Sequence, residues 1–291
     1  YNKYIRYFSI VHSPSRLGAY LAGLWEGNGH ISMPNTSKSP TVDKHTPKLS
    51  ITFAEEDYPL VLLIKKLVGG IIRPKLAKHV YILTISNIPE LMNIVSLMNG
   101  HLRTPKLEYF NDVINWLETY TGEEFFIYDK NTSPILENAW LSGLIDAGGY
   151  FDINIRKNII ESSNDWVEVR MRLEQQQHDN ITGASYFEII NNICLSLKVT
   201  INTSVHHGNR YHLIFINKPE KFIELIKYLD KYPLFSSKFL NYNDLKICHS
   251  MILDNRHITL EARTYIKTLM NGMNSNRTYY NWDHLNKLES Y

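Results

Sequence analysis

The clearest pattern in the chain is an alternation of apolar and polar residues at period two. In residues 150–156, Phe151, Ile153 and Ile155 alternate with polar residues, and residues 167–175 alternate in the same way. Residues 48–53 repeat the pattern in the first half of the chain. Such alternation predicts strands with one face on an apolar core and one face in solvent. Antiparallel sheets have this character.

Helical and hairpin patterns follow each strand pair in the same order. We expect helices at about 57–68 and 180–197, hairpins of 70–75 with 79–86 and of 198–206 with 210–216, and closing helices at about 88–98, 104–120, 218–230 and 236–252. The chain is therefore predicted to be α+β, with two pseudo-symmetric αββαββα repeats and a four-stranded antiparallel sheet in each. The expected parts are an N-terminal extension (1–13), a first repeat (14–120), a linker (121–132), a second repeat (133–258), and a C-terminal helix and tail (259–291).

Two similar segments precede the strands, Leu21–Gly29 and Leu141–Gly149, and they start 120 residues apart (141 minus 21). Ser13-Pro14 and Ser133-Pro134 are typical of helix starts, so each segment is expected to end a helix. Small residues recur at a spacing of four along both helices, which allows two helix backbones to approach closely. The predicted contact residues are Ala22, Gly23, Ser142 and Gly143.

These two segments resemble the motif of the LAGLIDADG homing endonuclease and group I intron maturase family, in its single-chain, two-repeat form. The resemblance extends over roughly residues 14–252. It implies that the two motif helices pack together on a pseudo-twofold axis. It also implies that the two sheets form a saddle that lies along a nucleic-acid groove.

The resemblance implies a carboxylate at the eighth motif position of each repeat, where active members hold Mg²⁺. This chain has Asn28 and Gly148 there. Neither offers the charge that a hard cation prefers, so we expect no metal cofactor. Glu26 and Asp146 lie two positions earlier, about 200° around the helix, and are only weak candidates for replacement ligands. Glu55, Glu56 and Asp57 are expected to form a solvated acidic turn.

Other positions also match the family. Lys106 and Lys238 resemble the basic residues near the family's active site, and Gln175 resembles a polar residue that orders solvent there, whereas its counterpart is Phe53. The side chains expected to contact nucleic acid are Ser32, Lys48, Ser50, Asn154, Arg156, Arg170 and Arg172, with Lys198, Asn202, Arg210 and His212 extending the surface.

Composition limits the alternatives only mildly. Hydrophobic residues make up 44% and charged residues 21% of the 291 residues, with a net charge of +2, as in an ordinary globular protein. No apolar run is long enough for a membrane span. Asn, Ile, Lys, Tyr and Phe are abundant, and all have A/T-rich codons. This favours an A/T-rich organelle genome and therefore the mitochondrial matrix, with a fungal host as one source.

Three functions remain open from the sequence. The first is a maturase that binds group I intron RNA and assists its splicing without cleaving DNA. The second is a Mg²⁺-dependent homing endonuclease that has been inactivated at its two acids, with double-stranded DNA as its ligand. The third is a relic that serves as a structural component of a ribonucleoprotein. In each case we expect a monomer with pseudo-twofold symmetry.

Overall fold

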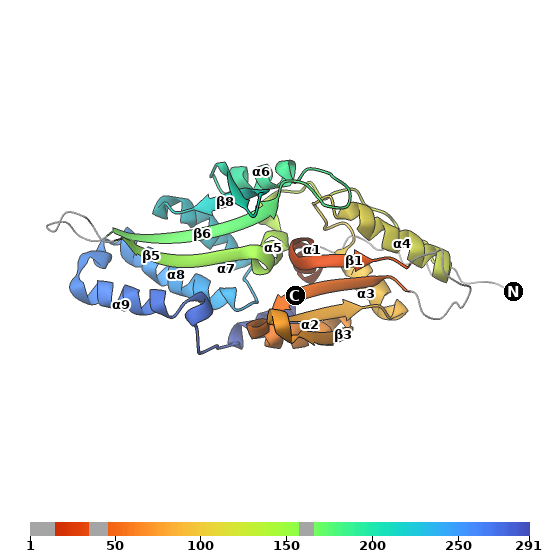
Figure 1. Ribbon diagram of the computed structural model, residues 1–291, viewed down its shortest axis with the longest axis horizontal. Coiled ribbons are helices and arrows are strands. Elements are labelled where there is room, and N and C mark those ends of the chain that lie inside the picture. The colour runs from red at the N-terminus through yellow and green to blue at the C-terminus, as the bar shows by residue number, and fades with distance from the viewer. Residues whose placement is uncertain (1–14, 35–45, 157–165) are drawn as a thin grey trace.

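Two central helices, one from each motif, divide the molecule into similar halves (Figure 1). The computed structural model describes residues 15–34, 46–156 and 166–291. Helix α1 (Arg16–Asn28) and helix α5 (Trp140–Gly148) pack side by side, and each continues directly into a strand. The predicted central helix pair is confirmed. The predicted N-terminal extension, 1–13, lies outside the described residues.

Each half contains one antiparallel sheet of four strands. The first sheet has the order β1-β2-β4-β3, and the second has the equivalent order β5-β6-β8-β7. The strands are β1 (Gly29–Ser32), β2 (Lys48–Ala54), β3 (Ile71–Lys75), β4 (Val80–Ile85), β5 (Gly149–Arg156), β6 (Trp166–Gln176), β7 (Ile201–His206) and β8 (Asn209–Ile216). The α+β architecture predicted from the alternating pattern is confirmed.

The remaining helices cover one face of each sheet. They are α2 (Tyr58–Val68), α3 (Ile88–Met98) and α4 (Leu107–Thr121) in the first half, and α6 (Phe187–Ser196), α7 (Phe222–Lys231), α8 (Lys238–Leu253) and α9 (Leu260–Asn271) in the second. The alternate strand residues Leu49, Ile51, Val169 and Met171 are fully buried against this helical layer. The opposite faces of the sheets carry the polar residues and are called the polar faces below. None of the described helices is both long and apolar enough to cross a membrane.

Several helix starts differ from the prediction, among them those of α1, α5 and α6. Ser15 accepts a hydrogen bond from the Gly18 backbone N–H at the start of α1, and the predicted start at Ser13-Pro14 lies outside the described residues. Helix α5 begins at Trp140, because residues Ile135–Glu137 form a separate 3₁₀ turn. Helix α6 begins at Phe187, because Asp179 accepts hydrogen bonds from the Ile181 and Thr182 backbones and holds the preceding turn.

The C-terminal segment runs from α9 back toward the middle of the molecule (Figure 1). Its last 3₁₀ segment, Asp283–Ser290, buries Leu285 and Leu288. Lys66 of α2 forms an ion pair with Glu289 at 2.7 Å. The segment therefore connects the second half of the molecule to the first.

Candidate nucleic-acid interface and motif centre

The two motif helices touch through their backbones. A Cβ on Gly23 would lie 1.9 Å from the Trp140 carbonyl oxygen, and a Cβ on Gly143 would lie 2.0 Å from that of Tyr20. Ala22 and Ser142, the other predicted contact residues, are fully buried. Only glycine permits this separation, which explains the small residues of both motifs.

The eighth motif positions lie close together at the ends of these helices. Asn28 is exposed, and its side-chain Nδ2 donates a hydrogen bond to the Ala147 carbonyl at 2.9 Å. Gly148 is also exposed, and a Cβ there would meet only the Leu173 Cδ1 atom, at 3.4 Å. A cleft of about 340 Å³ opens beside this point between the two halves. Asn28 thus links the repeats by its amide.

The acids two positions earlier are buried and fully engaged. Glu26 accepts hydrogen bonds from the backbone N–H groups of Arg103 and Thr104, from the Thr104 hydroxyl, and from the Trp140 indole. Asp146 accepts equivalent bonds from Tyr20, Phe235 and Ser236. Burial raises the pKa of both carboxyls, and these donors oppose that effect.

The bonds to Trp140 and Tyr20 cross between the repeats, so both acids connect the halves. The weak alternative, in which Glu26 and Asp146 replace the metal ligands, is therefore wrong, since protein donors occupy their oxygens. Their predicted structural role is confirmed.

A second pair of acids also bridges the halves. Asp57 is only 5% exposed and accepts a hydrogen bond from the Ser237 backbone N–H at 2.7 Å. Asp179, its pseudo-symmetric counterpart, accepts from the Tyr109 hydroxyl at 3.1 Å. The prediction that Asp57 belongs to a solvated turn is wrong, because the partner that buries it comes from a segment 180 residues away.

Two lysines hold the carbonyl groups at the ends of the motif helices. Lys106 Nζ donates to the Gly29 carbonyl at 2.7 Å, and Lys238 Nζ donates to the Ala147 carbonyl at 3.0 Å. Cations are favoured at helix C-termini, where the helix dipole is negative. Burial lowers the pKa of both ammonium groups, that of Lys106 to about 8.

These donors bear directly on metal binding. A divalent cation needs several oxygen ligands, usually including a carboxylate. At the ends of the two motif helices, called the motif centre below, an amide and two ammonium groups donate to the carbonyl oxygens that a cation would need as ligands. Neither eighth position supplies a carboxylate there. No group of three metal-ligating side chains occurs within the described residues. The residues present do not fit Mg²⁺.

We predict that Lys106→Met changes stability in a pH-dependent way. Because the pKa of Lys106 falls to about 8 on folding, from 10.5, the unfolded chain binds more protons between these two values. Stability from this group therefore rises with pH across that window and is lowest below pH 8. Between pH 7 and pH 10.5, the free energy of unfolding of the natural chain should rise by about 3 kcal/mol relative to that of the methionine variant. Urea unfolding at several pH values measures this.

Lys48→Met, at an exposed position, is the matched control for the loss of a lysine. A constant difference between Lys106→Met and the natural chain from pH 7 to 10.5 would contradict the prediction. It would mean that the ammonium group is not held at a desolvated position.

The polar face of the first sheet carries cations without acids. The strand register places Lys48 opposite Ser32, Arg73 opposite Ile82 and Lys75 opposite Val80, all on this one face. Their side chains belong to exposed residues. Strands β1–β4 contain no Asp or Glu.

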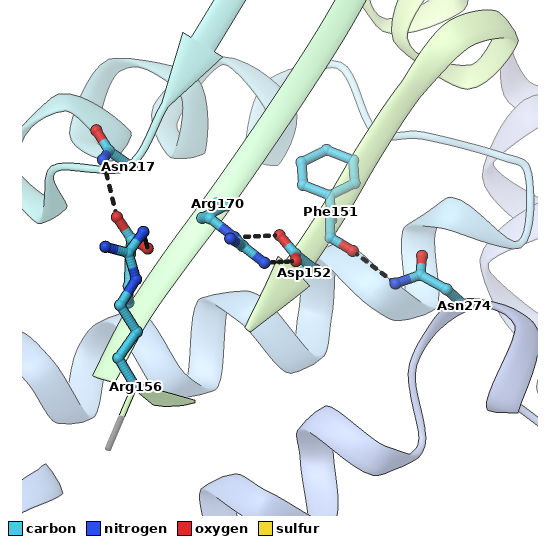
Figure 2. A network of polar contacts seen from close by, with 7 residues as sticks. Phe151, Asp152, Arg156, Arg170, Asn217 and Asn274 are labelled. Carbon is cyan, nitrogen blue, oxygen red and sulfur yellow. Dashed lines mark hydrogen bonds and ion pairs between the residues drawn. The ribbon is translucent and has the colours of Figure 1, made fainter. Parts of the chain in front are cut away.

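The polar face of the second sheet carries three arginines, two of which are paired with acids. Figure 2 shows Arg170 of β6 facing Asp152 of β5, to which it donates two hydrogen bonds, one of 3.0 Å. Arg156 forms an ion pair of 3.3 Å with Glu168, which also accepts from Asn217 at 2.8 Å. Arg172 is exposed and lies over the Phe215 ring.

Seven of the eleven side chains predicted to contact nucleic acid lie where the prediction requires, and the other four are described in the next paragraph. Those on the polar faces and at least partly accessible are Ser32, Lys48, Asn154, Arg156, Arg170, Arg172 and Asn202. Gln175 is half-buried and pairs with His212 on the other side of its sheet. It lies outside the polar face.

The other four predicted contact residues are either buried or lie outside the polar faces. Ser50 is only 4% exposed, and its hydroxyl pairs with that of Thr84 at 3.1 Å. His212 is 8% exposed and packs against Phe187 of α6, on the helical side, and Arg210 shares its face. Lys198 precedes β7 and forms an ion pair with Glu224 of α7. The prediction of an accessible side chain was therefore wrong for Ser50 and His212. Arg210 and Lys198 are exposed, but they lie outside the polar faces.

Arg73 and Lys75 were missed by the sequence interpretation. They occupy alternate positions of β3, as their spacing of two permits. The signal was present, but it required the register of β3 against β4.

The arrangement is a two-repeat α+β fold with polar sheet faces on either side of a paired-helix centre. The protein-family model described as "LAGLIDADG endonuclease" matches residues 21–117 and 141–249 of this sequence. The chain belongs to the LAGLIDADG endonuclease family.

Named relatives agree with this assignment. The intron-encoded DNA endonuclease aI3 of Saccharomyces cerevisiae is 28% identical over 310 aligned residues, which cover 96% of this chain and 74% of that protein. A probable intron-encoded DNA endonuclease aI1 of Mycosarcoma maydis is 41% identical over 99 residues, 34% of this chain and 82% of that protein.

Solved structures share the fold. The LAGLIDADG homing endonuclease I-LtrWI, bound to target DNA, has a TM-score of 0.68 at 18% identity and covers 91% of this chain and 100% of its own. I-SmaMI, bound to an uncleaved DNA target in the presence of calcium ions, has a TM-score of 0.64 at 15% identity, with 88% of this chain and 98% of its own covered.

Proposed function

We propose that this protein recognises a double-stranded DNA target and that its metal-dependent cleavage is lost or strongly impaired. The observation that carries the proposal is the pairing of two polar sheet faces with a motif centre that has no carboxylate at either eighth position. The fold is shared with proteins whose structures contain target DNA.

The strands favour duplex DNA over duplex RNA. A two-stranded ribbon fits the major groove of B-DNA, about 12 Å wide, where side chains can read base edges. The major groove of A-form RNA is too narrow for such readout. Two sheets with four strands each and exposed arginines on their polar faces suit the wider groove.

Cleavage loss follows from the chemistry of the motif centre. Hydrolysis by this family depends on the metal-binding acids that the resemblance implies, and here Asn28 donates its amide to Ala147 instead. Lys106 and Lys238 remain in place, but they hold helix-end carbonyls rather than a free phosphate group.

A second candidate is an intron maturase that binds group I intron RNA. The observation that favours it is the retention of a well-packed fold with cations on both polar faces but without the cleavage acids, since a role in splicing needs no cleavage. A structural role in a ribonucleoprotein is a third outcome of the test. For all three we propose a monomer in the mitochondrial matrix, in keeping with intron-encoded fungal relatives and the abundance of residues that have A/T-rich codons.

The test compares affinity for the intron-less DNA duplex with affinity for the host intron RNA at matched salt, because affinities at unmatched salt are not comparable. We expect the DNA duplex to bind at least tenfold more tightly. Tighter binding of folded intron RNA, together with faster splicing, would establish the maturase instead. Failure to bind either, with co-purification in a large particle, would support the ribonucleoprotein role.

A further inference from the structure

The polar faces of the two sheets are similar in fold but different in charge. The first carries three cations, Lys48, Arg73 and Lys75, and no carboxylate. The second carries three arginines and also three acids, Asp152, Glu168 and Glu174. The formal charge of the strand side chains is therefore +3 on the first face and zero on the second, with histidine neutral.

The cations of the first sheet have no acidic partner among the described residues. Lys75 and Arg73 are exposed on the edge strand β3. Lys75 also contributes, after burial and Lys106, to a lowered pKa of His30 on β1. Its charge therefore acts on the motif end of the sheet, where free cations would contact phosphates.

Two of the three arginines of the second sheet are held in place by acids, and the third, Arg172, is exposed over the Phe215 ring. Arg170 is bound through two nitrogens by Asp152, and its side chain is only 19% exposed (Figure 2). Glu168 is 7% exposed, and both of its oxygens are used, by Arg156 and Asn217. These pairs fix the direction of each side chain and cancel its charge.

Free and paired cations have different consequences for binding. A free lysine that neutralises a phosphate releases counterions, and this term does not depend on sequence. A guanidinium already neutralised by a carboxylate contributes little to that term. A fixed arginine or carboxylate, however, can bond selectively to base edges, arginine to guanine and an acid to the cytosine amino group.

We propose that the two halves divide the work of recognition, an inference that rests on the proposed function. The first sheet supplies sequence-independent affinity for the phosphates of one half-site. The second sheet discriminates base pairs in the other half-site through the Arg170–Asp152 and Arg156–Glu168 pairs. The target is thus a duplex whose two half-sites differ in how strongly their base sequence affects binding.

The experiment measures affinity over a range of salt for two duplexes, one of random sequence and one selected from a randomised library by the natural chain. Lys75→Gln should lower the affinity for both duplexes about three- to eightfold near 0.1 M salt and reduce the salt slope by about 0.9. The double variant Asp152→Asn with Arg170→Gln keeps the net charge unchanged. It should bind the random duplex like the natural chain but lose roughly 5- to 150-fold in preference for the selected duplex.

Asp152→Asn alone should change the affinity for random duplex in the direction opposite to that of Lys75→Gln. It releases Arg170 from its carboxylate, so the affinity for random duplex should rise about three- to eightfold, with a salt slope steeper by about 0.9. Asp230→Asn is the matched control, because Asp230 pairs with Lys246 between α7 and α8 and should change neither quantity.

Two results would overturn the division. One is an equal loss of preference in Lys75→Gln and in the double variant. The other is an Asp152→Asn variant that binds random duplex no better than Asp230→Asn. If the natural chain binds duplex DNA with the usual salt dependence, such results reject only the division. Absence of any duplex binding by the natural chain rejects the proposed function and the division together.

Discussion

Gly143→Ala is expected to destabilise the protein by more than about 4 kcal/mol, although it adds a single methyl group. The added carbon would lie 2.0 Å from the Tyr20 carbonyl oxygen and 2.7 Å from the Leu24 backbone nitrogen. Both are backbone atoms of α1, so the two helices would have to separate. Urea unfolding measures the loss, which is a large part of a typical total stability of about 5–15 kcal/mol.

Gly148→Ala in the same helix is the matched control. Its added carbon meets only the Leu173 Cδ1 atom, at 3.4 Å. Because alanine is also the better helix former by about 1 kcal/mol, this variant should be neutral or slightly more stable. If Gly143→Ala were as stable as Gly148→Ala, the helix contact would be looser than described.

The parts of the fold that depend on local pattern could be predicted from the sequence. Alternation in residues 150–156 and 167–175 correctly gave β5 and β6, with Phe151 and Val169 on the buried side. The small residues of the two motifs correctly gave the helix contact. In each case the signal and the structure involve the same few residues.

Features that depend on distant partners could not be predicted in this way. Asp57 looks like part of a solvated turn until Ser237 is brought against it. Arg170 and Asp152 both alternate onto the polar face, but the sequence does not show that they neutralise each other. His212 and Lys75 needed the strand register to be placed on the correct face.

The two repeats resemble each other more closely around the central helices than on the polar faces of the sheets. Glu26 and Asp146 each cap the loop before a following helix and accept a bond from the other repeat. Such buried carboxylates with several donors are costly to leave unpaired, so both repeats keep equivalent partners. The polar faces are not under this constraint, and there the repeats differ in charge.

Restoring acids at both eighth positions, Asn28→Asp with Gly148→Asp, is expected to create a Mg²⁺ site and to restore cleavage of the DNA target. Gly148 has room for a side chain. At position 28 the change removes the donor to Ala147, so two oxygens would face each other unless a cation lies between them. Mg²⁺ should therefore raise the Tm of the variant, with about 2.7 kcal/mol of stabilisation at 100 times Kd.

The natural chain and the control Asn28→Ala with Gly148→Ala should show neither effect, since both lack the carboxylates that hard cations prefer. Cleavage of a plasmid bearing the site should be at least about 10³-fold faster in the double-acid variant than in the natural chain, because a metal contributes several kcal/mol to such reactions. Efficient Mg²⁺-dependent cleavage by the natural chain would refute the proposed loss. Equal stabilisation of all three proteins by Mg²⁺ would place the ion away from the motif centre.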